Sequence, residues 1–263
     1  MSTFIEQWQD WHADRERELA DPHGWLALVS LDWLSEIPTT YSAAPGVWWQ
    51  DAEAAYVDPQ GAELSYEGEP ITGVQRFELV NSGAGTRVSA GDVEVEVARR
   101  SGYLIRVHSP KAPALRDFRG VPAYEPDPGW VITGTFERFP EPRPTTVGAV
   151  TPGLHHVYQA PGLVRFEHDG VEHELTAFNG KSGSGLNILF TDATSGVTTY
   201  PANRSLLTAE PAADGTVTLD FNRAINLPCA FTDFATCPLP PEGNDLPFEV
   251  TAGERIPHER TDS

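Results

Sequence analysis

The chain has 263 residues, 40% of them hydrophobic, so it can bury a large core as one big β domain or as two domains of ordinary size. Its 38 acidic residues against 18 Lys and Arg give a formal charge of −20, which argues against nucleic-acid binding because phosphate contacts need clustered basic residues. The first residues lack the pattern of a secretory signal, and no apolar run approaches the ~20 residues of a membrane span. We therefore expect a cytoplasmic protein that binds neither nucleic acid nor membrane.

Residues 1–22 are predicted to form an amphipathic N-terminal helix. Thr3-x-x-Glu6 is typical of a capping box, in which each side chain bonds the backbone N–H of the other residue. Apolar side chains then recur at helical spacing until Asp21-Pro22 stops the run.

From Gly24 onward the chain reads as short strands, which predicts a mainly β protein with one N-terminal helix. Residues 23–112 are predicted to form a β-sandwich-like domain. Its clearest strand is Val93–Val97, which alternates with apolar residues inward and acidic residues outward. The other strands expected here are Leu26–Leu34, Val47–Gln50, Gly73–Leu79 and Tyr103–His108.

A Pro-rich stretch, Ser109–Asp127, marks a boundary, and residues 113–263 are predicted to form a C-terminal antiparallel β barrel or sandwich. Trp130–Phe139 is expected to be a strand that ends at a second Pro-rich break, Pro140–Thr145. Further along, Leu186–Phe190 is expected to form a hairpin with Val197–Tyr200.

Leu163–Phe178 is the clearest hairpin, because Asp169-Gly170 suits the positive φ angles of a type I′ turn. A two-residue turn places His168 and His173 on the apolar face of the hairpin. Two such histidines are weak candidates for metal ligands or a proton relay. We favour half-buried histidines at the rim of the sheet, and expect no metal.

The most informative stretch is Thr216–Leu246. It begins as a strand in which Asp220 and Asn222 share the polar face, and it continues into a proline-rich segment that predicts a rigid loop. The loop carries both cysteines, Cys229 and Cys237. In a reducing compartment these are expected to be free thiols, with a disulfide or redox chemistry as alternatives; seven intervening residues do not suit a zinc site.

This stretch also carries a family resemblance. The ordered string LDFNRAINLPCAFTDFATCPLPPEGNDL, Leu219–Leu246, resembles the bacterial and archaeal family known as domain of unknown function 1684. Weaker similarity extends through Phe190–Tyr200, Phe118–Pro128 and Gly24–Leu34. The resemblance implies no particular activity.

In many members of that family, the region before the boundary looks like a phosphopeptide-binding forkhead-associated sandwich. Such modules bind phosphate through Arg, Ser and Asn on their loops. The matching stretch here, Ile37–Gly46, has neither an Arg nor a Gly-Ser turn, which argues against phosphate binding.

Polar side chains gather in the last third of the chain as the candidate site: Tyr200, Arg204, Asp220, Asn222, Asn226, Cys229, Cys237 and Asn244. One interpretation is a structural network that satisfies the loop's backbone groups, with Asp220 paired to Arg204. The other is a pocket at the mouth of the β domain, where Arg204 holds an anionic or carbonyl-bearing small molecule.

We therefore expect a small-molecule binding protein whose site lies in the C-terminal β domain. The sequence shows none of the common hydrolase, metalloprotease or dinucleotide-binding motifs, and no cofactor is expected. Two alternatives stay open. One is a hydrolase or thiol-dependent enzyme in which His155, His156 or His168 activates Cys229. The other is a flavin-binding split barrel.

Overall fold

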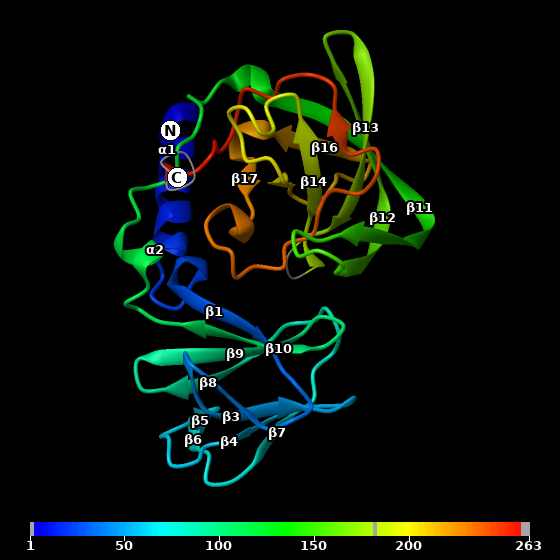
Figure 1. Ribbon diagram of the computed structural model, residues 1–263. Helices are drawn as coiled ribbons and strands as arrows, with labels where there is room; N and C mark the ends of the chain where they lie inside the picture. The colour runs from blue at the N-terminus through cyan, green and yellow to red at the C-terminus, as the bar shows by residue number, and fades with distance from the viewer. Residues whose placement is uncertain (1–2, 181–182, 259–263) are drawn as a thin grey trace. The chain divides into compact units, whose positions relative to one another are not determined.

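The computed structural model describes residues 3–180 and 183–258 and is mainly β (Figure 1). The chain divides into two compact units. We call residues 16–118 and 232–235 the N-terminal unit, and the remaining described residues the C-terminal unit. None of the described helices has the length and hydropathy of a membrane span.

The predicted N-terminal helix is confirmed as α1 (Phe4–Leu19). Its capping box is present: the Thr3 N–H donates to Glu6 Oε2 at 2.6 Å, and the Glu6 N–H donates to Thr3 Oγ1 at 3.2 Å. The first part of α1 belongs to the C-terminal unit, where Trp8 Nε1 donates to the carbonyl oxygen of Asn222 at 2.8 Å. A buried tryptophan N–H requires such an acceptor.

The N-terminal unit is a sandwich of two antiparallel sheets, as the sequence predicts. The larger sheet has the order β1-β10-β9-β8-β5-β6 and the smaller has the order β2-β3-β4-β7. One core fills the space between them, with Trp48 and Phe77 from the small sheet against Val95 and Ile105 from the large one. The strands are β1 (Leu28–Trp33), β2 (Thr39–Tyr41), β3 (Ala44–Gln50), β4 (Ala55–Asp58), β5 (Ser65–Tyr66), β6 (Glu69–Pro70), β7 (Gln75–Phe77), β8 (Thr86–Ala90), β9 (Val93–Arg99) and β10 (Tyr103–His108).

Two short helical turns flank this sandwich. A 3₁₀ turn over Trp25–Ala27 precedes β1, so the strand predicted from Leu26 begins later, at Leu28. The four-residue helix α2 (Pro113–Arg116) follows β10.

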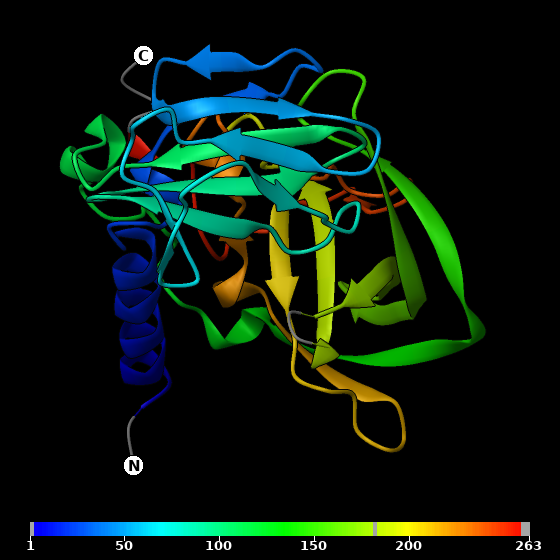
Figure 2. The ribbon, with the colours of Figure 1, turned by 90° about the horizontal axis from the view of Figure 1, so that it is seen from below.

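The C-terminal unit is an antiparallel sheet curled into a half-barrel, in the order β16-β11-β12-β13-β14-β15-β17. Its two outer strands, β16 and β17, are consecutive in the chain, so the single segment Thr216–Asn226 pairs with both edges of the sheet. The long strands β11 and β12, green in Figure 2, carry the curvature. The strands are β11 (Val131–Gly148), β12 (His155–His168), β13 (Val171–Asn179), β14 (Leu186–Asp192), β15 (Arg204–Leu207), β16 (Thr216–Asp220), β17 (Ile225–Asn226) and the parallel partner of β14, β18 (Asp245–Leu246).

The concave side of the half-barrel is the apolar core of this unit. Val217 and Leu219 of β16 point inward, and Phe221 follows them at the start of a 3₁₀ turn. Fully burying each such side chain contributes roughly 1.5–3 kcal/mol. The segment Thr216–Asn226 therefore holds the two edges by packing as well as by strand pairing.

The β12–β13 hairpin agrees with the prediction. His168 pairs with Val171 and Phe166 with His173. Asp169 has a φ of 52° and Gly170 a φ of 76°, as the type I′ turn requires.

The predicted break at Pro140–Thr145 is wrong, because β11 continues through it to Gly148. The pairing of β11 with β12 shifts register between Arg138 and Arg143. This irregularity accommodates prolines that cannot donate to a regular ladder.

The predicted strand Val197–Tyr200 is also wrong. The Thr194 carbonyl accepts the N–H groups of Val197, Thr198 and Thr199, so this segment forms turns. The antiparallel partner of β14 is β15 instead.

Substitutions at two glycines of the C-terminal unit test how tightly the segment around Gly253 packs against Phe221 and Ala224. Gly170 and Gly253 have similar positive φ angles, 76° and 79°, but only a Cβ at Gly253 would meet backbone atoms, at 2.6 Å from the Ala224 oxygen and 2.8 Å from the Phe221 oxygen. Gly170→Ala is expected to cost about 1 kcal/mol, for its φ alone. Gly253→Ala is expected to cost at least ~2 kcal/mol more, because the backbone must also move. Urea unfolding measures both, and equal costs would contradict the packing described.

Candidate functional site

Arg204, the central residue of the predicted site, is 1% exposed on β15. Its Nη2 donates to Asp192 Oδ2 at 2.7 Å and to the Val250 carbonyl at 3.0 Å, and its Nη1 donates to the Ala252 carbonyl. The predicted pairing of Arg204 with Asp220 is therefore wrong. Asp192, at the end of the neighbouring strand β14, is the partner.

Asp220 instead organises the turn that follows β16. Its carboxylate accepts the Asn222 N–H at 3.2 Å and the Asn222 Nδ2 at 3.0 Å, and it pairs with Arg223 Nε at 3.2 Å. Because β16 ends at Asp220, Asn222 lies in a 3₁₀ turn and not on the polar face of the strand. Its side chain is buried.

Burial lowers the pKa of Arg204 below its usual value, and the charge of Asp192 opposes that shift. An arginine still carries its charge at neutral pH. Asp192 and the two carbonyl groups therefore compensate a buried cation, and they tie the segment around Val250 to the sheet.

Two of the predicted asparagines, Asn222 and Asn244, each use the side-chain amide to bond both the N–H and the carbonyl group of one residue distant in sequence. The amide of Asn222 accepts from the N–H of Asp127 at 2.8 Å and donates to its carbonyl at 2.9 Å. The amide of Asn244 does the same with Thr176, at 2.8 and 2.9 Å, and also donates to the Leu189 carbonyl at 2.7 Å. Both side chains thus satisfy buried backbone groups.

Asn226 lies opposite Arg204 in the β15–β17 pair. Its Nδ2 donates to the Arg255 carbonyl at 2.7 Å, and its backbone N–H donates to Glu254 Oε2 at 2.6 Å. Glu254 is buried and also pairs with Arg15 Nε of α1 at 3.0 Å. This cluster fastens the helix and the end of the chain to β17.

Tyr200 and the two cysteines lie together. The Tyr200 hydroxyl donates to the Cys229 carbonyl at 2.9 Å, and Cys237 Sγ accepts the Cys229 N–H at 3.3 Å. Both cysteines are buried, and they are not joined in a disulfide. Nearby in sequence, the Thr236 carbonyl bonds the buried ring of His156 at 2.9 Å.

His168 and His173 belong to an aromatic cluster around Phe248. The centres of the His168 and His173 rings lie 4.3 and 4.8 Å from the centre of the Phe248 ring. Trp130 stacks on His168 with 5.1 Å between the ring centres. Within residues 3–180 and 183–258, no group of three or more His, Cys, Asp or Glu side chains could hold a metal ion. The sequence-predicted residues therefore form several local networks, and a ligand role for them stays a prediction.

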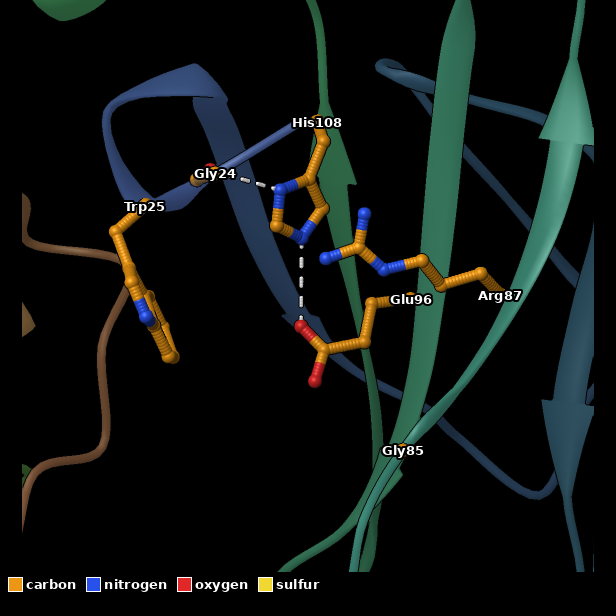
Figure 3. Close-up of a pocket in the computed structure, with 6 residues that line it drawn as sticks. All are labelled: Gly24, Trp25, Gly85, Arg87, Glu96 and His108. Atoms are coloured by element: carbon orange, nitrogen blue, oxygen red, sulfur yellow. Dashed lines mark hydrogen bonds and ion pairs between the residues drawn. The ribbon is translucent and has the colours of Figure 1, made fainter. Parts of the chain in front are cut away.

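A different cluster, in the N-terminal unit, surrounds a cavity of about 230 Å³ (Figure 3). Val95 and Ile105 point into the sandwich core, so alternation places the charged residues of β9 and β10 on the opposite face of the large sheet. We call this cavity the charged pocket. It is lined by Gly24, Trp25, Gly85, Arg87, Glu96 and His108.

Strand register brings the charges of this pocket together. Glu96 on β9 lies opposite Arg106 on β10 and opposite Arg87 on β8, so one carboxylate stands between two arginines. Arg106 Nη1 bonds both carboxylate oxygens of Glu96, at 3.1 and 3.2 Å, and its Nε donates to the Phe234 carbonyl at 3.0 Å. The Arg106 guanidinium also lies 5.5 Å from the centre of the Trp25 ring.

His108 completes the charged row. Its Nδ1 lies 3.0 Å from the Gly24 carbonyl and its Nε2 lies 3.4 Å from Glu96 Oε2, as the dashed lines of Figure 3 show. A carbonyl and a carboxylate are both acceptors, so the ring serves both only with a proton on each nitrogen.

Burial raises the pKa of Glu96, but hydrogen bonds from His108 and Arg106 together with their charges lower it further, to about 2 from 4.5. Glu96 is therefore ionised throughout the ordinary pH range. Its charge is matched by Arg106 and by the imidazole it faces.

Arg87 differs from Arg106 because part of its guanidinium is unused. Nη1 donates to Glu94 Oε2 at 2.5 Å and to the His23 carbonyl at 3.2 Å. Its Nε and Nη2 form no hydrogen bond with any residue in the described part of the chain, and the side chain is 45% exposed. These two nitrogens form the planar fork that carboxylates bind bidentately.

A family model matches the part of the chain that follows the charged pocket. The family model "Protein of unknown function (DUF1684)" matches residues 116–255, more than half of the sequence. The chain belongs to this family. The residues that line the charged pocket precede the stretch that the DUF1684 model matches.

A solution NMR structure of an uncharacterized protein from Haloarcula marismortui is 33% identical to this DUF1684 protein. The match covers 56% of this chain and 82% of that chain, with a TM-score of 0.46. No curated protein matches the chain.

The partner of Arg204 is tested by two matched substitutions in this DUF1684 protein. Asp192→Asn is expected to cost about 3–5 kcal/mol of the free energy of unfolding, because it leaves a buried guanidinium without its counter-charge. Asp220→Asn, which loses a more exposed pair with Arg223, is expected to cost less than about 1 kcal/mol. Urea unfolding compares them, and the reverse order would restore Asp220 as the partner.

The depressed pKa of Glu96 predicts an acid-dependent stability. Because the folded-state value of about 2 lies below the usual 4.5, this stabilisation is complete above pH 4.5 and is lost as the pH falls from 4.5 to 2. Glu96→Gln is expected to lose on the order of 3 kcal/mol at neutral pH, and to flatten the decline between pH 4.5 and 2.

The control for this experiment is Glu94→Gln. Glu94 lies on the same strand, but its partner Arg87 is far more exposed than Arg106, so the expected loss is less than about 1 kcal/mol. Parallel acid profiles for wild type and Glu96→Gln would show that Glu96 is not the group responsible.

Proposed function

We propose that this protein binds a small anionic, carbonyl-bearing molecule in the charged pocket, with Arg87 holding the ligand's carboxylate. The observation that carries the proposal is that Nε and Nη2 of Arg87 are free of hydrogen bonds to the described residues, while Arg87 lines a cavity together with Glu96, a carboxylate already paired with Arg106. A guanidinium whose Nη1 is held by Glu94 and by the His23 carbonyl loses little further freedom on binding, which favours affinity.

The arginine proposed to hold the ligand is Arg87, whereas the sequence predicts Arg204 in the C-terminal β domain. The Arg204 guanidinium donates to Asp192, Val250 and Ala252, and it is buried. A ligand at Nη1 or Nη2 would have to displace those groups and leave them without partners, and the remaining nitrogen, Nε, has no hydrogen-bond partner among the described residues but is buried. Arg87 requires no such exchange.

The alternatives considered from the sequence have weaker support. Cys229 and Cys237 are 4% and 6% exposed, which is typical of structural cysteines. Of the histidines proposed to activate Cys229, His155 is exposed, His156 bonds the Thr236 carbonyl through Nε2, and His168 stacks in the aromatic cluster. A thiol enzyme would lose activity on alkylation of Cys229, and a flavin-binding barrel would purify yellow.

Isothermal titration with acetate, succinate and benzoate tests the proposal. At least one of them is expected to bind, and Arg87→Gln is expected to weaken that binding about 10- to 100-fold, through loss of charged hydrogen bonds worth about 1.5–3 kcal/mol. Arg76→Gln is the matched control, since Arg76 is an exposed arginine that pairs with Glu53 in the same unit. Absence of binding by all three acids, or equal binding by the Arg87 variant, would overturn the proposal.

A further inference from the structure

We infer that the preferred ligand of the charged pocket is a carboxylate on a single aromatic ring, lying against Trp25. This inference rests on the proposed function and adds the chemical class of the group that carries the ligand's carboxylate. Three features of the pocket lead to it: its volume, its aromatic wall and the position of Glu96.

The volume selects a ligand of one ring. The pocket encloses about 230 Å³. A protein cavity of about 150 Å³ accommodates benzene. The charged pocket therefore has room for one six-membered ring with a carboxylate, and it lies below the ~300–1,000 Å³ of pockets for drug-sized ligands.

Trp25 supplies a wall for that ring. It is 37% exposed, and Figure 3 shows it across the pocket from Arg87 and Glu96. The guanidinium of Arg106 lies 5.5 Å from the centre of the indole ring, within the range of a cation–π contact that favours this position of the side chain. An indole that is ordered before binding can take an offset-stacked ring without a further ordering cost.

The opposite wall favours an aromatic ring over a saturated one. The Glu96 carboxylate stays ionised in the pocket, and the edge of an aromatic ring is the positive part of its quadrupole. Gly85 leaves room for this carboxylate in the wall of the pocket, because a Cβ there would lie 2.9 Å from Glu96 Oε1. A ring whose edge faces Glu96 and whose face meets Trp25 can direct its carboxylate to Arg87.

Isothermal titration of the full chain with benzoate, cyclohexanecarboxylate and acetate tests the inference. Benzoate is expected to bind at least 10-fold more tightly than acetate and several-fold more tightly than cyclohexanecarboxylate. Trp25→Leu is expected to weaken benzoate binding about 10-fold and to weaken acetate binding by a smaller factor, while Trp25→Phe retains most of the benzoate affinity.

Trp33→Leu is the matched control, because Trp33 is a similarly exposed tryptophan of the same unit. Thermal melts establish that each variant is folded. If acetate binds as tightly as benzoate, or if Trp25→Leu binds benzoate as wild type does, the inference is wrong and the proposed function stands. If no carboxylate binds, both are wrong.

Discussion

Each unit of this protein contains a buried arginine whose charge must be compensated. Arg106 and Arg204 are both 1% exposed. Each meets one carboxylate, Glu96 or Asp192, and each also donates to backbone carbonyl groups distant in sequence. Removing a counter-charge from such a site costs several kcal/mol, so these contacts hold the Phe234 and Val250 segments as firmly as strand pairing would.

The surroundings of Arg204 and Arg106 differ in which hydrogen-bonding groups remain available to a ligand. Around Arg204, the asparagines and carboxylates that looked like a binding site bond the protein's own backbone. Around Arg106, compensation is also complete, but strand register adds a second arginine, Arg87, on the other side of Glu96. Glu96 is paired with Arg106, and Arg87 is paired with Glu94 through Nη1 alone, so the Nε and Nη2 of Arg87 are left for the external anion that we propose. We therefore propose the N-terminal unit as the place of ligand binding, while the polar side chains around Arg204 bond the backbone of their own unit.

Local features were predictable from the sequence, whereas partners set by tertiary structure were not. The Thr3–Glu6 capping box and the Asp169-Gly170 turn depend on neighbouring residues, and both are present. The partner of Arg204 depends on which strand pairs with β15. Val197–Tyr200 was predicted to pair with β14, whereas β15 does so, and the proximity of Asp192 to Arg204 was therefore not predicted. Glu96 was interpreted as a solvent-facing residue of a regular strand. The signal that could have corrected this is Arg106 on the next strand, because a short turn at Ser101-Gly102 places opposite charges in register.

We propose that the charged pocket, and not the polar loop around Arg204, binds a small carboxylate. A titration of ¹⁵N-labelled protein with benzoate, followed through the arginine Nε–H cross-peaks in NMR spectra, tests it most directly. If benzoate binds in the charged pocket, the Arg87 cross-peak and the Trp25 indole cross-peak shift together and saturate, while the Arg204 cross-peak stays in place. A shift of Arg204 without one of Arg87, or no saturable shift at either arginine, would contradict it.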